Sequence, residues 1–202
     1  MKILALDLGS RTGWATSAGG HITSGFHEFK PDRFEGGGMR YLKFKFWLDQ
    51  IKAQIRGLDL VMFEEVRMHA GTTAAHLYGG FMAHLTAWCE AEKIPYQGVP
   101  VGTIKKHATG KGNAGKEQMI QAMRKKGHCD LQDDNEADAL AILYYAIEVM
   151  GHDVRERGKR VQKEPTSCGY CSYEEADGVL ISQCAKCRAQ DSPVRKRIRI
   201  NL

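Results

Sequence analysis

The chain begins with an apolar run, ILALDL at residues 3–8, that contains one charged residue, Asp7. The turn residues GSRTG follow at positions 9–13, so the run predicts a short strand that ends in a reversal of the chain. Burial of a single ionised carboxylate costs several kcal/mol unless the group is paired or binds a metal. A fold that contains this strand must therefore supply a partner or an ion for Asp7.

The order of the expected elements indicates an α/β fold. Apolar spacing predicts three strands in an antiparallel meander, then helices that alternate with strands, and therefore a mixed sheet flanked by helices. The expected strands occupy residues 2–8, 14–18, 21–29, 58–65 and 94–100, and the expected helices occupy residues 39–55, 73–93, 101–109, 114–126 and 134–150. The sequence DDNE at 133–136 predicts an N-cap and a capping-box glutamate for the last helix.

A length of 202 residues has room for one main domain and a small second unit. We expect a main domain at 1–150, a charged linker at 151–167 and a second unit at 168–202. The longest apolar stretch, residues 137–150, is shorter than the roughly 20 residues that cross a bilayer and carries two acids, so no membrane partner is expected. No secretory cleavage site follows the first residues, which predicts a cytoplasmic protein, or one of the host cytoplasm if it is viral.

Acids interrupt apolar stretches at two further places, as Asp7 does. Glu64 and its neighbour Glu65 end the fourth expected strand, and Asp138 lies in the first turns of the last expected helix. Because side chains alternate along a strand, only one of Glu64 and Glu65 is expected to join Asp7 and Asp138. Each acid alone has an ordinary interpretation, as a turn cap, a surface residue or a charge at a helix N-terminus. The three together favour one shared site.

The ligands available at such a site are all oxygens. Asp134 and Asn135 share a helix face with Asp138 and are placed to add a further oxygen ligand, and alanines at 137, 139 and 141 would let this helix approach the sheet closely. Oxygen-only sites suit Mg²⁺ or Mn²⁺. Two such ions about 4 Å apart activate a water and stabilise the leaving oxygen in phosphodiester hydrolysis. The pattern therefore indicates nuclease chemistry.

Four segments carry a resemblance to a known family: ILALDLGSRTGWA from residue 3, VMFEEVRM from 61, GKGNAGKEQM from 110 and DDNEADALAIL from 133. In order and spacing, residues 1–150 resemble the RuvC family of Holliday-junction resolvases, and most closely its bacteriophage-type members. The resemblance implies an RNase H-like fold, a homodimer and Mg²⁺-dependent nicking of branched DNA. It places the family's catalytic acids on Asp7, Glu64 and Asp138, and so favours Glu64 over Glu65.

The chain departs from the family pattern at two positions. The family's fourth ligand, an Asp or a His, falls on Asn135, for which Asp134 is the nearest substitute. The aromatic residue that the family inserts at the junction falls on Arg67. Lys105 and Lys116 match basic positions that the family places near the scissile phosphate, where they would offset negative charge.

Other function classes share part of this pattern. GKGNAGKE at 110–117 nearly forms a phosphate-binding P-loop, but Glu117 stands where that loop needs a hydroxyl, and a helical segment precedes it in place of a strand. An actin-like ATPase or sugar kinase shares the DLGSRTG opening, but it needs a second domain for which the chain is too short. A non-catalytic DNA-binding protein that uses the C-terminal cysteines is the other alternative.

Cys168, Cys171, Cys184 and Cys187 form two C-x₂-C pairs about a dozen residues apart, the spacing of a zinc ribbon. We expect one structural Zn²⁺, because so short a segment has no core of its own and the metal would supply its folding energy. The intervening SYEEADGVLISQ predicts a hairpin. The basic tail RKRIRI predicts a contact with the DNA backbone, in keeping with the net charge of +5, and a protein contact is the alternative.

Overall fold

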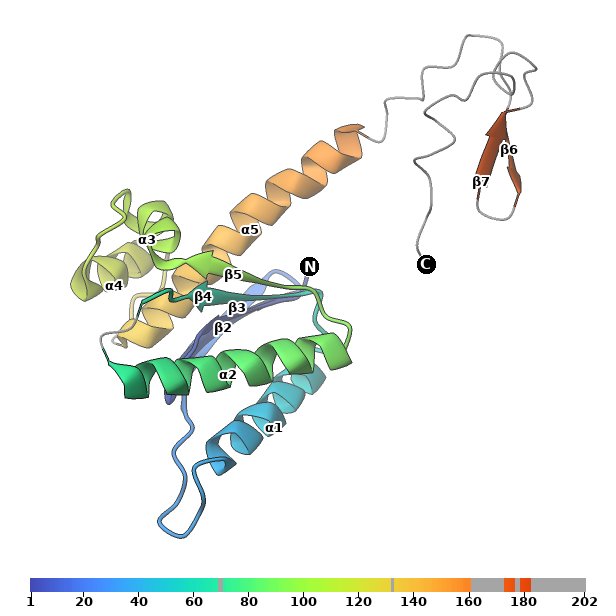
Figure 1. Ribbon diagram of the computed structural model, residues 1–202. Coiled ribbons are helices and arrows are strands. Elements are labelled where there is room, and N and C mark those ends of the chain that lie inside the picture. Colours follow the sequence, from blue (N-terminus) through green and yellow to red (C-terminus); the bar gives the residue numbers. More distant parts are fainter. Residues whose placement is uncertain (69–70, 132, 161–172, 177–178, 183–202) are drawn as a thin grey trace. The chain divides into compact units, whose positions relative to one another are not determined.

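The computed structural model describes residues 1–68, 71–131, 133–160, 173–176 and 179–182 (Figure 1). The chain divides into two compact units, residues 1–152 and 153–202. No described helix has both the length and the apolar composition needed to cross a bilayer. The first unit contains the sheet and the acids.

A five-stranded sheet in the order β3-β2-β1-β4-β5 forms the centre of the first unit. Its strands are β1 (Ile3–Asp7), β2 (Arg11–Ala18), β3 (His21–Glu28), β4 (Leu60–Glu65) and β5 (Tyr96–Pro100). The first three strands form an antiparallel meander, whereas β4 runs parallel to both β1 and β5. The predicted mixed sheet is confirmed, and β1 lies at its centre.

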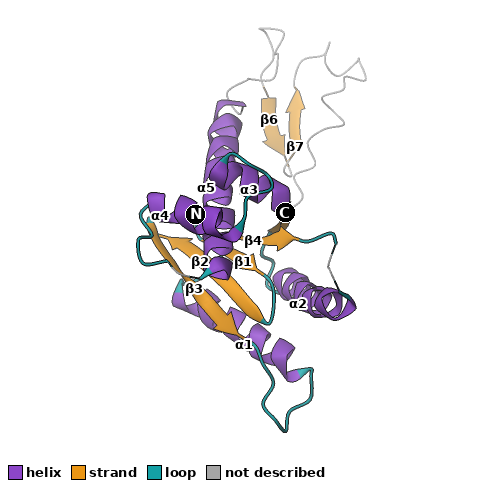
Figure 2. Cartoon of the chain, turned by 90° about the vertical axis from the view of Figure 1, so that its left-hand side faces the viewer, coloured by secondary structure: helices purple, strands orange, loops and turns teal. Residues whose placement is uncertain are grey.

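Helices cover both faces of this sheet (Figure 2). One face packs against α1 (Met39–Gln54) and α2 (Thr72–Ala91), and the other against α3 (Val101–Thr109), α4 (Lys116–Lys125) and α5 (Asp134–Arg160). The expected helices are all present. However, α5 continues to Arg160, through the first part of the segment predicted as a linker. The Arg, Lys and Glu residues of that segment favour helix although they offer no apolar face, so apolar periodicity did not predict the extension.

Alternate residues of the central strands enter two separate cores. Leu4 and Leu6 of β1 pack with the residues of α1 and α2, while Ile3 and Ala5 pack with those of α5. The two-residue period of the strand therefore directs residue 7 toward the α5 face. The position of Asp7 follows from the same pattern that buries its apolar neighbours.

The close approach of α5 to the sheet depends on small residues. Ala137, Ala139 and Ala141 are fully buried in the α5-side core, in keeping with the close approach predicted from their small size. Gly13 of β2 pairs with Asp7 of β1, and a Cβ atom on Gly13 would lie 1.9 Å from the backbone oxygen of Asn135. A side chain at position 13 would thus displace the first turn of α5.

Asp133 caps this helix. Its Oδ1 accepts hydrogen bonds from the backbone N–H of Asn135 at 3.0 Å and of Glu136 at 3.2 Å. The predicted capping-box contact is replaced: Glu136 Oε1 accepts a hydrogen bond from Ser24 Oγ of β3 at 2.6 Å. Arg11 of β2 also pairs with Asp133, at 2.5 Å. The start of α5 is therefore fixed to the meander by side chains as well as by packing.

In the second unit, β6 (Tyr173–Ala176) and β7 (Val179–Ser182) pair antiparallel. The strand pairing predicted between the two C-x₂-C pairs is confirmed. The four cysteines predicted to bind zinc lie outside the described residues. The zinc ribbon itself stays a prediction.

We expect Gly13→Ala to destabilise the protein by about 1–3 kcal/mol, because the added methyl group meets backbone that has no rotamer with which to move aside. Urea denaturation of the two proteins measures the difference. Gly79→Ala in α2 is the matched control, since a Cβ there meets nothing within 4 Å, and it should stabilise the protein by up to about 1 kcal/mol, because Ala favours helix over Gly. Equal stability of the wild type and Gly13→Ala would contradict the close approach of α5.

Candidate active site

Acidic side chains from β1, β4 and α5 come together on the α5 face. Asp7 is the last residue of β1, Glu64 lies next to the end of β4, and Asp138 lies in the first turns of α5. The carboxyl groups of Asp7 and Glu64 hydrogen bond to each other, and Asp138 is close enough for its charge to act on Asp7. The structure thus brings together the three acids singled out in the sequence.

Strand alternation separates Glu64 from Glu65. Leu60 and Met62 of β4 belong to the α5-side core, so Glu64, two residues further on, lies on that face. Val61 and Phe63 belong to the other core, and Glu65 follows them there, with its carboxylate 3.5 Å from the Arg67 guanidinium. One of the two glutamates is placed with Asp7, as the alternation predicted, and it is Glu64, as the family resemblance implied.

Burial raises the pKa of each acid, and the charges of neighbouring acids further raise the pKa values of Asp7 and Asp138. Burial is the largest cause for Asp7, whose pKa lies well above its ordinary value, and the charges of Glu64 and Asp138 raise it further. The pKa of Asp138 rises to about 7, mainly through burial and then through Glu64. Burial also raises the pKa of Glu64, against the opposing effects of the Asp7 hydrogen bond and the Lys105 charge. Nearby positive charges therefore do not fully neutralise the three carboxyl groups.

Two lysines partly offset this charge. Lys105 of α3 acts on both Glu64 and Asp138 and lowers their pKa values. Lys116, the first residue of α4, forms an ion pair with Asp134 and lowers the pKa of that carboxyl. Both lysines predicted from the sequence thus lie within electrostatic reach of the acids. Their action on a phosphate stays a prediction.

Asp134 and Asn135, the two alternatives for a fourth oxygen ligand, have different surroundings. The charge of Asp134 acts on Asp7 and on Asp138 and raises the pKa of both. The Asn135 side chain instead donates from Nδ2 to Asp133 Oδ1 at 3.3 Å, as part of the helix cap. The electrostatic contacts favour Asp134 as the neighbour of the acid cluster.

The donor set fits Mg²⁺ or Mn²⁺ in its chemistry, since every predicted ligand atom is an oxygen. In the described part of the chain, however, no three His, Cys, Asp or Glu side chains converge as a group that could hold a metal ion. Asp7 and Glu64 are within hydrogen-bonding reach of each other, and Asp138 acts on Asp7 through its charge.

A basic groove between α3 and α4 lies on the same side of the sheet. Its volume is about 420 Å³, and its lining contains Lys111, Lys125 and Lys126 but no Asp or Glu. In the sequence these lysines belong to two separate basic runs, and the packing of α3 on α4 brings them together. Such a surface suits the phosphates of a nucleic-acid backbone.

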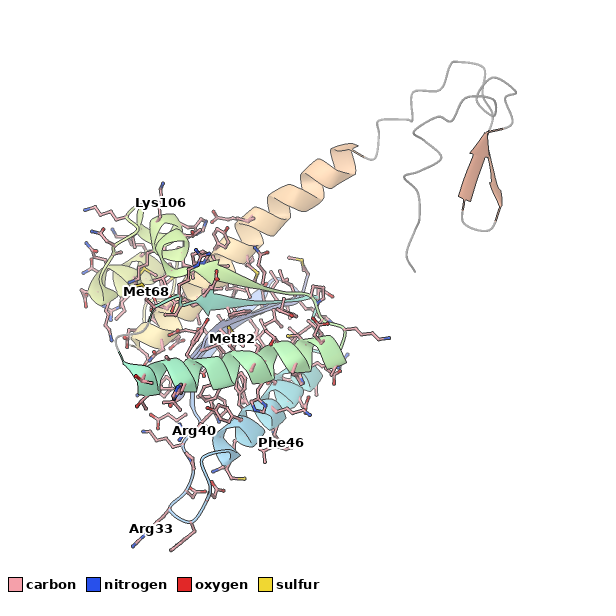
Figure 3. The ribbon with its side chains drawn as sticks, viewed as in Figure 1. Arg33, Arg40, Phe46, Met68, Met82 and Lys106 are labelled. Carbon is pink, nitrogen blue, oxygen red and sulfur yellow. The ribbon has the colours of Figure 1, made fainter. Side chains whose placement is uncertain are left out.

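Tyr78 contacts the backbone at Glu64 from the opposite face of the sheet, and no sequence pattern predicts this contact. Tyr78 lies in an apolar stretch of α2 and is indistinguishable there from a core aromatic residue. Arg67 and Met68 follow β4 and are exposed; Figure 3 shows Met68 beside the end of that strand. The segment that begins at Val66 is therefore accessible to a large ligand.

Comparison with solved structures identifies the fold. Thermus thermophilus RuvC matches with a TM-score of 0.59 and 19% identity over 75% of this chain and 97% of that chain. RuvC of the same species in complex with a Holliday junction substrate matches with a TM-score of 0.57 and 20% identity, over 70% and 90% of the two chains. The yeast mitochondrial Holliday junction resolvase Ydc2 matches with a TM-score of 0.50 and 13% identity, over 69% and 75%.

No protein-family model matches the chain, and no curated protein matches it by sequence. At these identities the likeness to the solved structures is one of fold. The first unit has the RNase H-like fold of RuvC, as the four sequence segments suggested.

We expect Asp7→Asn to raise the stability of the metal-free protein at pH 7.5, because the neutral amide removes a largely buried charge that Glu64 and Asp138 repel. A raised pKa means that the folded state retains protons that the unfolded chain releases above pH 3.8, so folding stability falls as pH rises toward about 7. The gain should therefore be smaller at pH 4.5. Thermal unfolding in EDTA at the two pH values measures it.

Asp130→Asn, at an exposed position, is the control for this change and should leave the melting temperature unaltered. A lower melting temperature for Asp7→Asn in EDTA would show that Asp7 is not held among like charges.

Proposed function

We propose that this protein is a divalent-metal-dependent endonuclease that cuts branched DNA, with the Holliday junction as its substrate. The observation that carries the proposal is the meeting of Asp7, Glu64 and Asp138 at the end of the central strands of a RuvC-like fold. Three largely buried acids with raised pKa values destabilise a protein that has no use for them. A bound cation would reverse that cost.

The side chains have distinct roles in the proposed reaction. Asp7, Glu64 and Asp138 would hold two Mg²⁺ or Mn²⁺ ions, with Asp134 or Asn135 as a further ligand. When bound, two such ions supply an activated water and stabilise the leaving oxygen of a phosphodiester. Lys105 and Lys116 would offset the negative charge that develops on the phosphate, from positions already within reach of the acids.

Branched DNA is the substrate class that the fold comparison supports. One neighbour was solved with a Holliday junction substrate, and another is named as a Holliday junction resolvase. Such a substrate has two equivalent strands, and a homodimer of this chain would cut both symmetrically. We further propose a bacteriophage-type enzyme that acts in the cytoplasm of its host.

In the second unit, Cys168, Cys171, Cys184 and Cys187 would hold one structural Zn²⁺ around the β6–β7 pair. The basic tail that follows would then contact the DNA backbone.

Nucleotide hydrolysis at a P-loop and DNA binding without catalysis have less support. A P-loop follows a strand, whereas helix α3 precedes the glycine-rich segment 110–117. The structure therefore does not support the P-loop interpretation. A non-catalytic DNA-binding protein would have no need for three acids in one largely buried cluster.

Cleavage of a synthetic four-way junction tests the proposal. We expect nicking in Mg²⁺ or Mn²⁺, none in EDTA, and a loss of at least about 100-fold in Asp138→Asn, because a metal ligand is removed. Forks, flaps, RNA–DNA hybrids and linear duplexes in the same assay define the substrate range. Asp130→Asn is the control and should cut at the wild-type rate. Undiminished nicking by Asp138→Asn would refute the assignment.

Removal of residues 168–202 should weaken DNA binding and flatten its dependence on salt, by about 0.9 in log–log slope for each lost phosphate contact. The rate at saturating DNA should be retained, because the acids lie in the first unit. Filter binding at several salt concentrations measures the slope. A full-length variant with Arg195, Lys196 and Arg197 changed to Gln separates the tail from the zinc ribbon. An unchanged slope in both proteins would assign this segment to a protein contact.

A further inference from the structure

Tyr78 contacts the backbone on both sides of Glu65. Its hydroxyl donates a hydrogen bond to the carbonyl oxygen of Glu64 at 2.7 Å and accepts one from the backbone N–H of Val66 at 3.2 Å. Tyr78 belongs to α2, on the face of the sheet opposite α5 (Figure 2). One hydroxyl thus joins α2, on one face of the sheet, to the backbone of Glu64, whose side chain lies on the opposite face.

The position of this contact in the sheet gives it a structural role. Pairing of β4 with β1 ends at Phe63, whereas pairing with β5 continues to Glu65, opposite Pro100. Beyond Phe63, β4 is therefore held by β5 alone among the described strands, and proline offers no N–H there. The Tyr78 hydroxyl supplies hydrogen bonds at the point where the ladder to β1 stops.

The Tyr78 ring is held firmly enough for this task. The residue is 7% exposed and packs in the core between the sheet and the helices α1 and α2. A hydroxyl on a ring fixed by packing has little freedom, so it sets the backbone position more narrowly than a surface side chain would.

Two features of the proposed site depend on that backbone. Glu64 has its carboxyl group against Asp7, where a displacement of the strand would alter the spacing of the acids. Val66 begins the segment of Arg67 and Met68, and Met68 is 89% exposed beside the end of β4 (Figure 3). The same contact therefore orients a predicted metal ligand and the start of an exposed segment.

We infer that Tyr78 is a positioning residue: its hydroxyl fixes the backbone of Glu64 and Val66, and so places the Glu64 carboxylate for divalent metal. This inference rests on the proposed nuclease function. Tyr78 itself touches neither metal nor DNA and acts through Glu64.

Tyr78→Phe removes only the hydroxyl and tests this role. We expect the Mg²⁺ concentration for half-maximal cleavage of a four-way junction to rise about 10-fold and kcat to fall about 10-fold to 100-fold, as for other groups that orient metal ligands. The affinity for the junction should not change. Thr16→Val is the matched control, since it also removes one buried hydroxyl, which is hydrogen bonded to Thr23 at 2.7 Å. These two residues lie in β2 and β3, which contain none of the three acids.

Two measurements without DNA separate positioning from general stability. The first is the rise in melting temperature on titration with Mn²⁺, which should need about 10-fold more Mn²⁺ in Tyr78→Phe but not in Thr16→Val. The second is amide hydrogen exchange at Val66, which should be protected in the wild type and faster in Tyr78→Phe alone. Exchange in the wild type is informative even if the variant does not fold.

The outcomes distinguish the inference from the function on which it rests. If Tyr78→Phe and Thr16→Val have the same metal requirement, or if Val66 exchanges freely in the wild type, the positioning role is wrong. If the wild type cuts no DNA in Mg²⁺ or Mn²⁺, the nuclease proposal fails instead, whatever the exchange at Val66. Normal wild-type cleavage with a selective defect in Tyr78→Phe supports both.

Discussion

The carboxyl group of Asp7 lies at the end of the central strand, largely buried, and shares a hydrogen bond with Glu64 while Asp138 repels it. Neighbouring parts of the fold accommodate this arrangement. Gly13 leaves space for the first turn of α5, Asp133 fixes that turn, and Lys105 reduces the excess of negative charge. Of these features, the Lys105 charge is the one that acts on the acids directly.

Much of this site could be predicted from the sequence, because it follows from local periodicity. A two-residue period along β1 and β4 directs Asp7 and Glu64 to one face and Glu65 to the other. The alanines at 137, 139 and 141 indicate a helix that packs closely. The acids stand out because each interrupts an apolar run, and a buried charge is costly enough to require an explanation.

Other features depend on contacts between distant residues and leave no periodic signal. Tyr78 looks like an ordinary core residue until the end of β4 is placed beside its hydroxyl. Glu136 fits a capping box, but the side chain of Ser24 competes for its carboxylate once β3 packs nearby. Helix α5 extends ten residues past the predicted end at 150. Residues 151–160 have no apolar periodicity, so only their helix propensity could have predicted the extension.

The Arg11–Asp133 pair joins residues 122 positions apart in the chain. Asp7 and Asp138 are separated to a similar degree, and Glu64 comes from the middle of the same unit. Contacts of such long range form late in folding, since the entropy of closing the intervening loop is lost before they contribute. During synthesis the acids can meet only after nearly all of the first unit has left the ribosome. Incomplete chains would therefore lack the assembled acid cluster, and with it the site proposed to bind divalent metal.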